Sequence, residues 1–237
     1  MDMLGIYAGT TADLGLLIDL LPGYLEFHYN PPPPPLPPPA IGVPTTETQG
    51  AYIPIPTITS NIALGISLGG HAAYLAALHL DKVTSAIPII ACADYPALIS
   101  NRLKQSKLVP VVSASSSSNT PSAWMPSSFL NLLLNSQSRA QSPLLTSPHN
   151  TPLGALKGKK LLILSGGADK LVPPEHSRGF IESLRREIDQ GELKGTKAAV
   201  REVVYDGVGH EFTLEMAEEV RRFVRDRVVE AREAWIL

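Results

Sequence analysis

The chain has 237 residues, of which 44% are hydrophobic, enough apolar side chain to bury the core of one large domain or two small ones. The net charge is only −2, from 20 basic and 22 acidic residues, and the longest basic cluster is KGKK at 157–160, so nucleic acid is not expected as a partner. A single cysteine, Cys92, excludes an intramolecular disulfide and lacks neighbours at metal-ligand spacing, which favours a cytoplasmic protein without a metal site.

The N-terminal segment predicts a helix and no membrane anchor. Its first 21 residues are apolar, but Asp2, Asp13 and Asp19 interrupt them, so neither a signal peptide nor a bilayer span is expected. The hydroxyl of Thr10 and the acid three residues later are typical of a helix start. Pro22 and the glycine after it predict the end of that helix.

A proline-rich segment then divides the chain. The sequence PPPPPLPPP at Pro31–Pro39 cannot supply helix or sheet hydrogen bonds and favours an extended polyproline conformation. We therefore expect a helix at 1–29, a loop or linker at 30–60, and a core at 61–237 with a cap-like, flexible insertion at 95–155. The proline run is also a candidate ligand for an SH3 or WW domain.

Strands and helices are predicted to alternate after the linker. A buried strand beginning at Asn61 precedes an alanine-rich helix, and further apolar strands follow at 84–94, 159–169 and 198–205, the last two followed by helices that begin near Pro174 and Thr213. This order predicts an α/β fold with a mostly parallel sheet of about four strands and helices on both faces. The chemistry of such sheets gathers at the carboxyl ends of the strands.

The segment Gly65–Gly69, GISLG, matches G-x-S-x-G between a predicted strand and a predicted helix. We expect Ser67 to occupy a strained turn, and a side chain at Gly65 or Gly69 to collide with the neighbouring helix or strand. The helix start behind the serine favours negative charge near its oxygen.

A serine nucleophile needs a base, and the base needs an orienting acid. Asp169 follows one predicted strand and His210 follows the next, so both loops are expected at the same sheet edge as Ser67. The interval of 102 residues between Ser67 and Asp169 is long enough for a cap.

Taken together, GISLGGHA at 65–72, LSGGADKLVP at 164–173 and GVGHEFT at 207–213 resemble the nucleophile, acid and base loops of fungal α/β-hydrolases. The resemblance implies a partial α/β-hydrolase fold and a serine hydrolase that acts on an ester or related acyl bond of a small molecule, with no cofactor. It implies Ser67 as nucleophile, Asp169 as acid and His210 as base. It also implies the Leu68 N–H as an oxyanion donor.

Several alternatives remain open at this point. Asp94, at the end of the preceding predicted strand, is a second candidate acid. His71 is interpreted as a helix residue that caps or packs, Cys92 as a small buried hydrophobe, and Asp206 as a turn residue.

The family's earlier strands and its second oxyanion loop have no counterpart before residue 61. We therefore expect an N-terminally truncated hydrolase with an exposed apolar edge strand. The alternative function is a catalytically impaired remnant or a proline-rich interaction module.

Overall fold

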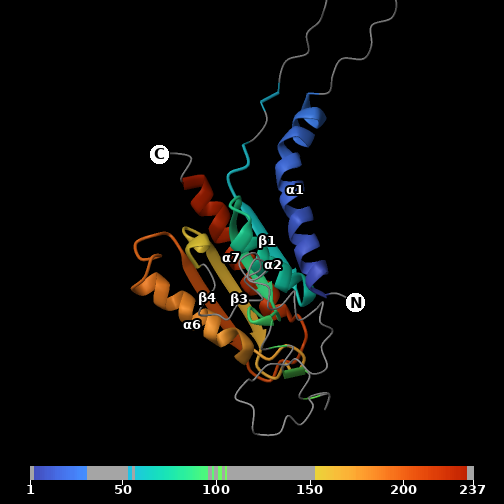
Figure 1. Cartoon of the computed structure of the whole chain (residues 1–237). Coiled ribbons are helices and arrows are strands. Elements are labelled where there is room, and N and C mark those ends of the chain that lie inside the picture. The colour runs from blue at the N-terminus through green and yellow to red at the C-terminus, as the bar shows by residue number, and fades with distance from the viewer. Residues whose placement is uncertain are drawn as a thin grey trace, which may run out of the picture.

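Four strands form one parallel sheet in the computed structural model, which describes residues 3–30, 53–54, 57–95, 98, 101–102, 105 and 153–233 (Figure 1). They are β1 (Asn61–Ile66), β2 (Val83–Ile89), β3 (Lys160–Gly166) and β4 (Ala199–Tyr205), and they lie side by side in that order. The predicted α/β fold with a parallel sheet is confirmed.

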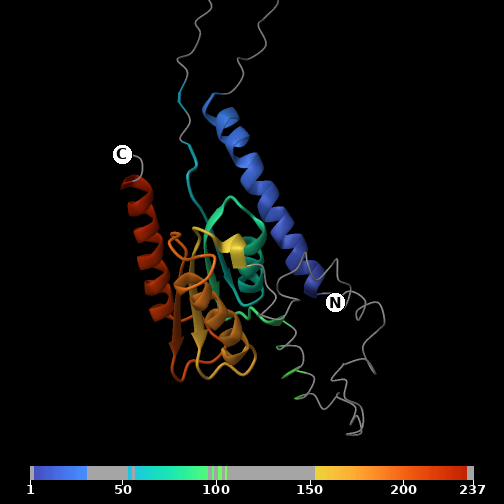
Figure 2. The same ribbon diagram turned by 60° about the vertical axis from the view of Figure 1, so that its left-hand side comes forward.

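Helices cover both faces of the sheet. Around the sheet lie α1 (Met3–Tyr29), α2 (Leu68–His79), the short 3-10 helix η3 (Leu153–Leu156), α6 (Glu175–Asp189) and α7 (Leu214–Glu233). The buried side chains of α1, α2 and α6 share one apolar cluster, whereas α7 contributes to a separate cluster on the other face. Figure 2 shows α7 on one side of the strands and α1 and α6 on the other.

The inner strands carry the core. Ile87 and Ile89 of β2 and Leu162 and Leu164 of β3 have no exposed surface. A strand covered on both faces has to be apolar at successive positions, which is why the continuous apolar runs in the sequence predict these strands well.

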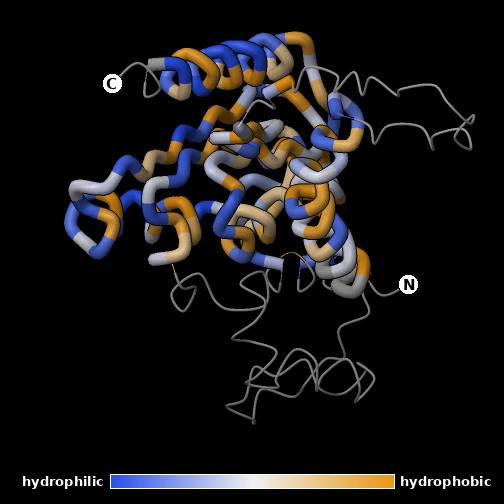
Figure 3. The backbone as a smooth tube through the Cα atoms, turned by 90° about the horizontal axis from the view of Figure 1, so that it is seen from above, coloured by the Kyte–Doolittle hydropathy of each residue, from blue (hydrophilic) through white to orange (hydrophobic). Residues whose placement is uncertain are grey.

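The amphipathic pattern of α7 is visible in Figure 3, where hydrophilic and hydrophobic segments alternate along the helix. Met216 is fully buried, and Val220, Phe223 and Val224 pack beside it against the sheet. Val228 shares their spacing, yet it is 51% exposed. The apolar stripe of α7 therefore runs past the covering sheet at its C-terminal end.

The N-terminal helix occupies the segment predicted at 1–29, but the start near Thr10 and the end at Pro22 that the local pattern indicates are wrong. It begins at Met3 instead of near Thr10 and continues through Pro22 to Tyr29. Thr11 donates its hydroxyl hydrogen to the carbonyl oxygen of Tyr7, four residues earlier, at 2.9 Å, which is the hydrogen bond of a threonine inside a helix. The fixed φ of proline is helical, so Pro22 removes one hydrogen bond without ending the helix.

The strand β1 lies at one edge of the sheet. Within the part of the chain that the structure describes, its strand partner is β2 alone. Leu64 is 49% exposed and Ile66 is 41% exposed. The apolar edge expected from the sequence is therefore present among these residues.

Helix α2 packs tightly against the sheet through small side chains, as the sequence predicts. Ala72, Ala73, Ala76 and Ala77 are buried. At the C-terminus of α2 the buried Lys159 donates from Nζ to the carbonyl oxygens of Ala77 (2.7 Å) and Leu80 (2.9 Å). These bonds satisfy acceptors that the helix itself leaves open.

Two sequence predictions concern residues that lie largely or wholly outside the described ranges. The segment Pro31–Pro39 and most of the insertion predicted at 95–155 lie outside the described residues. Among the residues that the structure does describe, no helix combines the length and apolar character needed to cross a bilayer, and no three His, Cys, Asp or Glu side chains form a metal-binding group.

Candidate active site

The backbone of Ser67 is strained. Its φ is 53° and its ψ is −112°, a region that side-chain-bearing residues rarely adopt. The residue joins the end of β1 directly to the start of α2, and its N–H donates to the carbonyl oxygen of Ile89 on β2 at 2.8 Å. The tight turn therefore holds the hydroxyl at the carboxyl edge of the sheet.

The crowded glycines of this turn are Gly65 and Gly70. A Cβ at Gly65 would overlap with the backbone of Gly69, and a Cβ at Gly70 would lie 2.5 Å from the Cβ of Ala91. At Gly69 an added Cβ meets no heavy atom of the described residues within 4 Å. The predicted collision at Gly69 is wrong, because that residue lies on the open side of the first turn of α2 while Gly70 faces the strands.

Three side chains from three loops form one hydrogen-bonded chain. Ser67 Oγ lies 2.8 Å from His210 Nε2, and His210 Nδ1 lies 2.7 Å from Asp169 Oδ2. The Asp169 side chain is fully buried, and its other oxygen accepts the N–H groups of Leu171 and Val172, each at 2.8 Å. These bonds fix the orientation of the carboxylate that faces His210.

The loops that carry Asp169 and His210 are joined by backbone contacts. The N–H of Ala168 donates to the carbonyl oxygen of Val208 at 2.8 Å. A Cβ at Gly166 would overlap with the carbonyl oxygens of Val208 and Gly209. Glycine at the end of β3 therefore allows the loop of His210 to approach the loop of Asp169.

The N-terminus of α2 offers one further polar group to the site. Leu68 is the first residue of α2, and the first N–H groups of a helix have no acceptor within it. The Leu68 N–H therefore has no acceptor within the helix, and its role as an oxyanion donor stays a prediction.

His71 lies directly behind Ser67 and is only 2% exposed. Its Nδ1 lies 2.9 Å from the carbonyl oxygen of Ser67, and its Nε2 lies 3.4 Å from the backbone N of Cys92. The ring stacks on Tyr7 with centroids 5.0 Å apart and meets Tyr95 edge to face. The sequence signal for the first contact is the four-residue spacing from Ser67, which brings a helical side chain back to an earlier carbonyl.

The burial of His71 gives a prediction about acid stability. Burial lowers the pKa of the imidazole from 6.5 to about 4, and it outweighs the bond to Ser67, which favours the charged form. Between these values the unfolded chain binds more protons than the folded one, so stability falls as the pH falls. At about 1.4 kcal/mol per pH unit the loss amounts to about 3 kcal/mol.

Urea unfolding of the wild type and of His71→Asn at pH 6.5 and pH 4 measures this loss. We expect the wild type to lose about 3 kcal/mol more than the variant, because asparagine does not titrate there. Parallel losses in the two proteins would contradict the assignment to His71.

Cys92 is not a candidate nucleophile. The side chain is fully buried, and burial raises the pKa of its thiol to about 12. The thiolate is the reactive form, so the prediction of a small buried hydrophobe holds.

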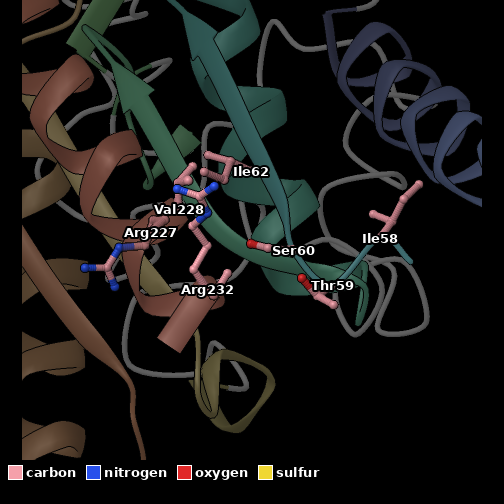
Figure 4. Close-up of a pocket in the computed structure, with 8 residues that line it drawn as sticks. Ile58, Thr59, Ser60, Ile62, Arg227, Val228 and Arg232 are labelled. Atoms are coloured by element: carbon pink, nitrogen blue, oxygen red, sulfur yellow. The ribbon is translucent and has the colours of Figure 1, made fainter. Parts of the chain in front are cut away.

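A pocket of about 520 Å³ lies beside Ser60 and Ile62 and the end of α7 (Figure 4). Its walls come from the residues before β1, from Ile62, and from the last turns of α7, including Val228 and Arg232. The pocket is at the start of β1, whereas Ser67 follows the end of that strand, a separation of about 20 Å at about 3.3 Å per residue. This pocket is therefore not the place where a substrate would meet the serine.

Comparison with known proteins gives matches among solved structures only. No family model matches the chain, and a search of curated proteins found no match. Similar structures include a puromycin hydrolase (TM-score 0.40, 17% identity over 64% of this chain and 18% of the other). TT1662 from Thermus thermophilus has a TM-score of 0.43 at 19% identity, with 70% of this chain and 53% of the other covered.

Acyl-protein thioesterase 2 from Zea mays is a third similar structure, with a TM-score of 0.37 at 13% identity over 69% of this chain and 54% of the other. The chain thus spans between 18% and 54% of the length of these three structures. At these identities and TM-scores the likeness bears on neither activity nor substrate, so the function is inferred from the geometry of the site.

Proposed function

We propose that this chain is a serine hydrolase of the α/β-hydrolase type that cleaves an ester or related acyl bond of a small molecule. The observation that carries the proposal is the continuous hydrogen-bonded chain from Ser67 Oγ through both ring nitrogens of His210 to Asp169. A serine hydroxyl becomes a nucleophile at neutral pH when a base so oriented takes its proton.

In the first half of the reaction Ser67 Oγ attacks the acyl carbon and His210 Nε2 takes the hydroxyl proton. Asp169 accepts the Nδ1–H of His210 and stabilises the imidazolium that forms. The Leu68 N–H donates to the oxyanion of the tetrahedral intermediate. The bond from the acyl carbon to the leaving group then breaks, and His210 gives its proton to the departing oxygen.

In the second half a water molecule attacks the acyl-enzyme. His210 takes a proton from the water, the second tetrahedral intermediate collapses, and Ser67 Oγ recovers the proton as the acid product leaves. The same three side chains serve both halves, so one disrupted hydrogen bond slows both steps.

Labelling with a fluorophosphonate tests the proposal directly, because this reagent phosphonylates an activated serine and releases fluoride. The intact mass of the purified chain is expected to increase by a single adduct, and Ser67→Ala is expected to remain unlabelled. Hydrolysis of p-nitrophenyl acetate should be lost with the same substitution. A folded wild type that forms no adduct, or Ser67→Ala that still forms one, would refute the assignment.

A further inference from the structure

We propose that His71 is a positioning residue for the nucleophile: its imidazole anchors the backbone carbonyl of Ser67 and so holds the hydroxyl in line with His210. The inference rests on the proposed function and extends it to a residue outside the Ser67, His210 and Asp169 chain. It follows from three observations on the described residues, taken in turn below.

The strained backbone of Ser67 is fixed at both ends by hydrogen bonds. At its amino end the N–H donates to the carbonyl oxygen of Ile89 at 2.8 Å. At its carboxyl end the oxygen faces Gly70 N (2.9 Å), the backbone N of His71 (3.2 Å) and His71 Nδ1 (2.9 Å). Backbone contacts alone would be made by any helix, whereas the contact with Nδ1 depends on the side chain at residue 71. This side chain therefore adds the sequence-specific part of the restraint.

A single neutral tautomer satisfies both nitrogens of His71. The carbonyl oxygen of Ser67 can only accept, so Nδ1 carries the proton. The backbone N–H of Cys92 can only donate, so Nε2 is the acceptor. Protonation of Nε2 would place two donors face to face, in agreement with the lowered pKa of this imidazole. In this tautomer the Nδ1–H of His71 donates to the carbonyl oxygen of Ser67.

The ring has little freedom to turn away from Ser67. Tyr7 of α1 stacks on it with an interplanar angle of 6°, and Tyr95 contacts it edge to face with centroids 6.4 Å apart. Stacking and edge contacts of this kind stabilise a fixed ring orientation. Helix α1 thus supports the turn of Ser67 through the imidazole that lies between them.

A displaced serine would affect the chemical step more than binding. A misplacement of about 1 Å can cost about 100-fold in rate, and an interaction that matters in the transition state lowers kcat without raising KM. Loss of the Nδ1 bond is therefore expected to lower kcat and the phosphonylation rate, with KM nearly unchanged.

Two substitutions at residue 71 separate positioning from packing. His71→Leu retains most of the volume but has no donor, whereas His71→Asn leaves a cavity but keeps a nitrogen donor near the position of Nδ1. We expect the leucine variant to lose about 10- to 100-fold in kcat and in phosphonylation rate. The asparagine variant should stay within about threefold of the wild type, although it is the less stable protein because of its cavity.

Lys159→Met is the matched control at the other end of α2. It removes the Nζ bonds to Ala77 and Leu80, and so destabilises the same helix without altering the contacts of Ser67. Its kcat per folded molecule should equal that of the wild type. Urea unfolding of all four proteins gives the folded fraction by which each rate is normalised.

The outcomes separate the inference from the proposed function. A wild type inert to fluorophosphonate refutes both. A reactive wild type with an equally reactive His71→Leu refutes the inference alone, and so does His71→Asn when its rate falls as far as that of the leucine variant. Activity that follows stability across all four proteins would also refute it, because a packing role predicts that order.

Discussion

Replacing Asp169 by asparagine is expected to lower kcat by about 10³- to 10⁴-fold while the protein stays folded. The Oδ1 of asparagine can still accept the N–H groups of Leu171 and Val172, so the loop keeps its shape. The amide nitrogen, however, donates where Oδ2 accepted from His210 Nδ1. His210 must then adopt the tautomer with the proton on Nε2, which cannot take the proton of Ser67.

Asp94→Asn is the control, since Asp94 is the alternative acid suggested by the sequence. Initial rates with p-nitrophenyl acetate and the phosphonylation rate measure both variants, and circular dichroism verifies the fold. Asp94→Asn should retain activity within about threefold. The reverse pattern, with a large loss at Asp94 and a small one at Asp169, would assign the acid to Asp94, which follows β2 (Val83–Ile89) by five residues.

Gly65→Ala is expected to have the largest effect on stability. The new methyl group would overlap with the carbonyl of Gly69, and backbone atoms cannot move aside as a flexible side chain can. Overpacking of a core usually costs about 1–3 kcal/mol, and we expect about 3 kcal/mol or more at this position. The midpoint of urea unfolding and the yield of soluble protein measure the effect.

Gly69→Ala is the matched change on the other glycine of the same motif. Its Cβ meets nothing within 4 Å among the described residues, and alanine is favoured over glycine in a helix by about 0.5–1 kcal/mol. We expect this variant to be at least as stable as the wild type. Equal destabilisation by the two substitutions would contradict the different surroundings that the structure gives them.

The parts of the fold that follow from local pattern were predictable. The inner strands read as apolar runs because both of their faces are covered, and the alternation with helices predicts the parallel order. The ends of α1 were not predictable in this way. A threonine hydroxyl can cap the start of a helix or bond to a carbonyl one turn earlier inside it, and the sequence is the same in both cases. The structure shows the second arrangement, because residues before Thr10 are helical and Thr11 bonds to Tyr7.

In the site, too, some features follow from local pattern and others depend on residues that are distant in sequence. Placing Ser67, Asp169 and His210 after strands predicts a shared sheet edge, and the distances of 2.8 and 2.7 Å agree with it. The surroundings of His71 could not be predicted, because they are formed by Cys92, Tyr7 and Tyr95. These residues are distant in sequence, and one chain gives no indication that they converge on one ring.

The position of β1 at the sheet edge connects local opening to catalysis. Ser67 follows β1, which among the described residues is hydrogen-bonded to another strand on one side only. Opening an edge strand costs less free energy than opening the interior of a sheet. Separation of β1 from β2 would break the bond from the Ser67 N–H to the carbonyl oxygen of Ile89. Ser67 would then lose its orientation in molecules whose β2, β3 and β4 are still paired. Amide exchange at 65–67 measures the fraction of such molecules, and so sets an upper limit on the fraction of reactive protein.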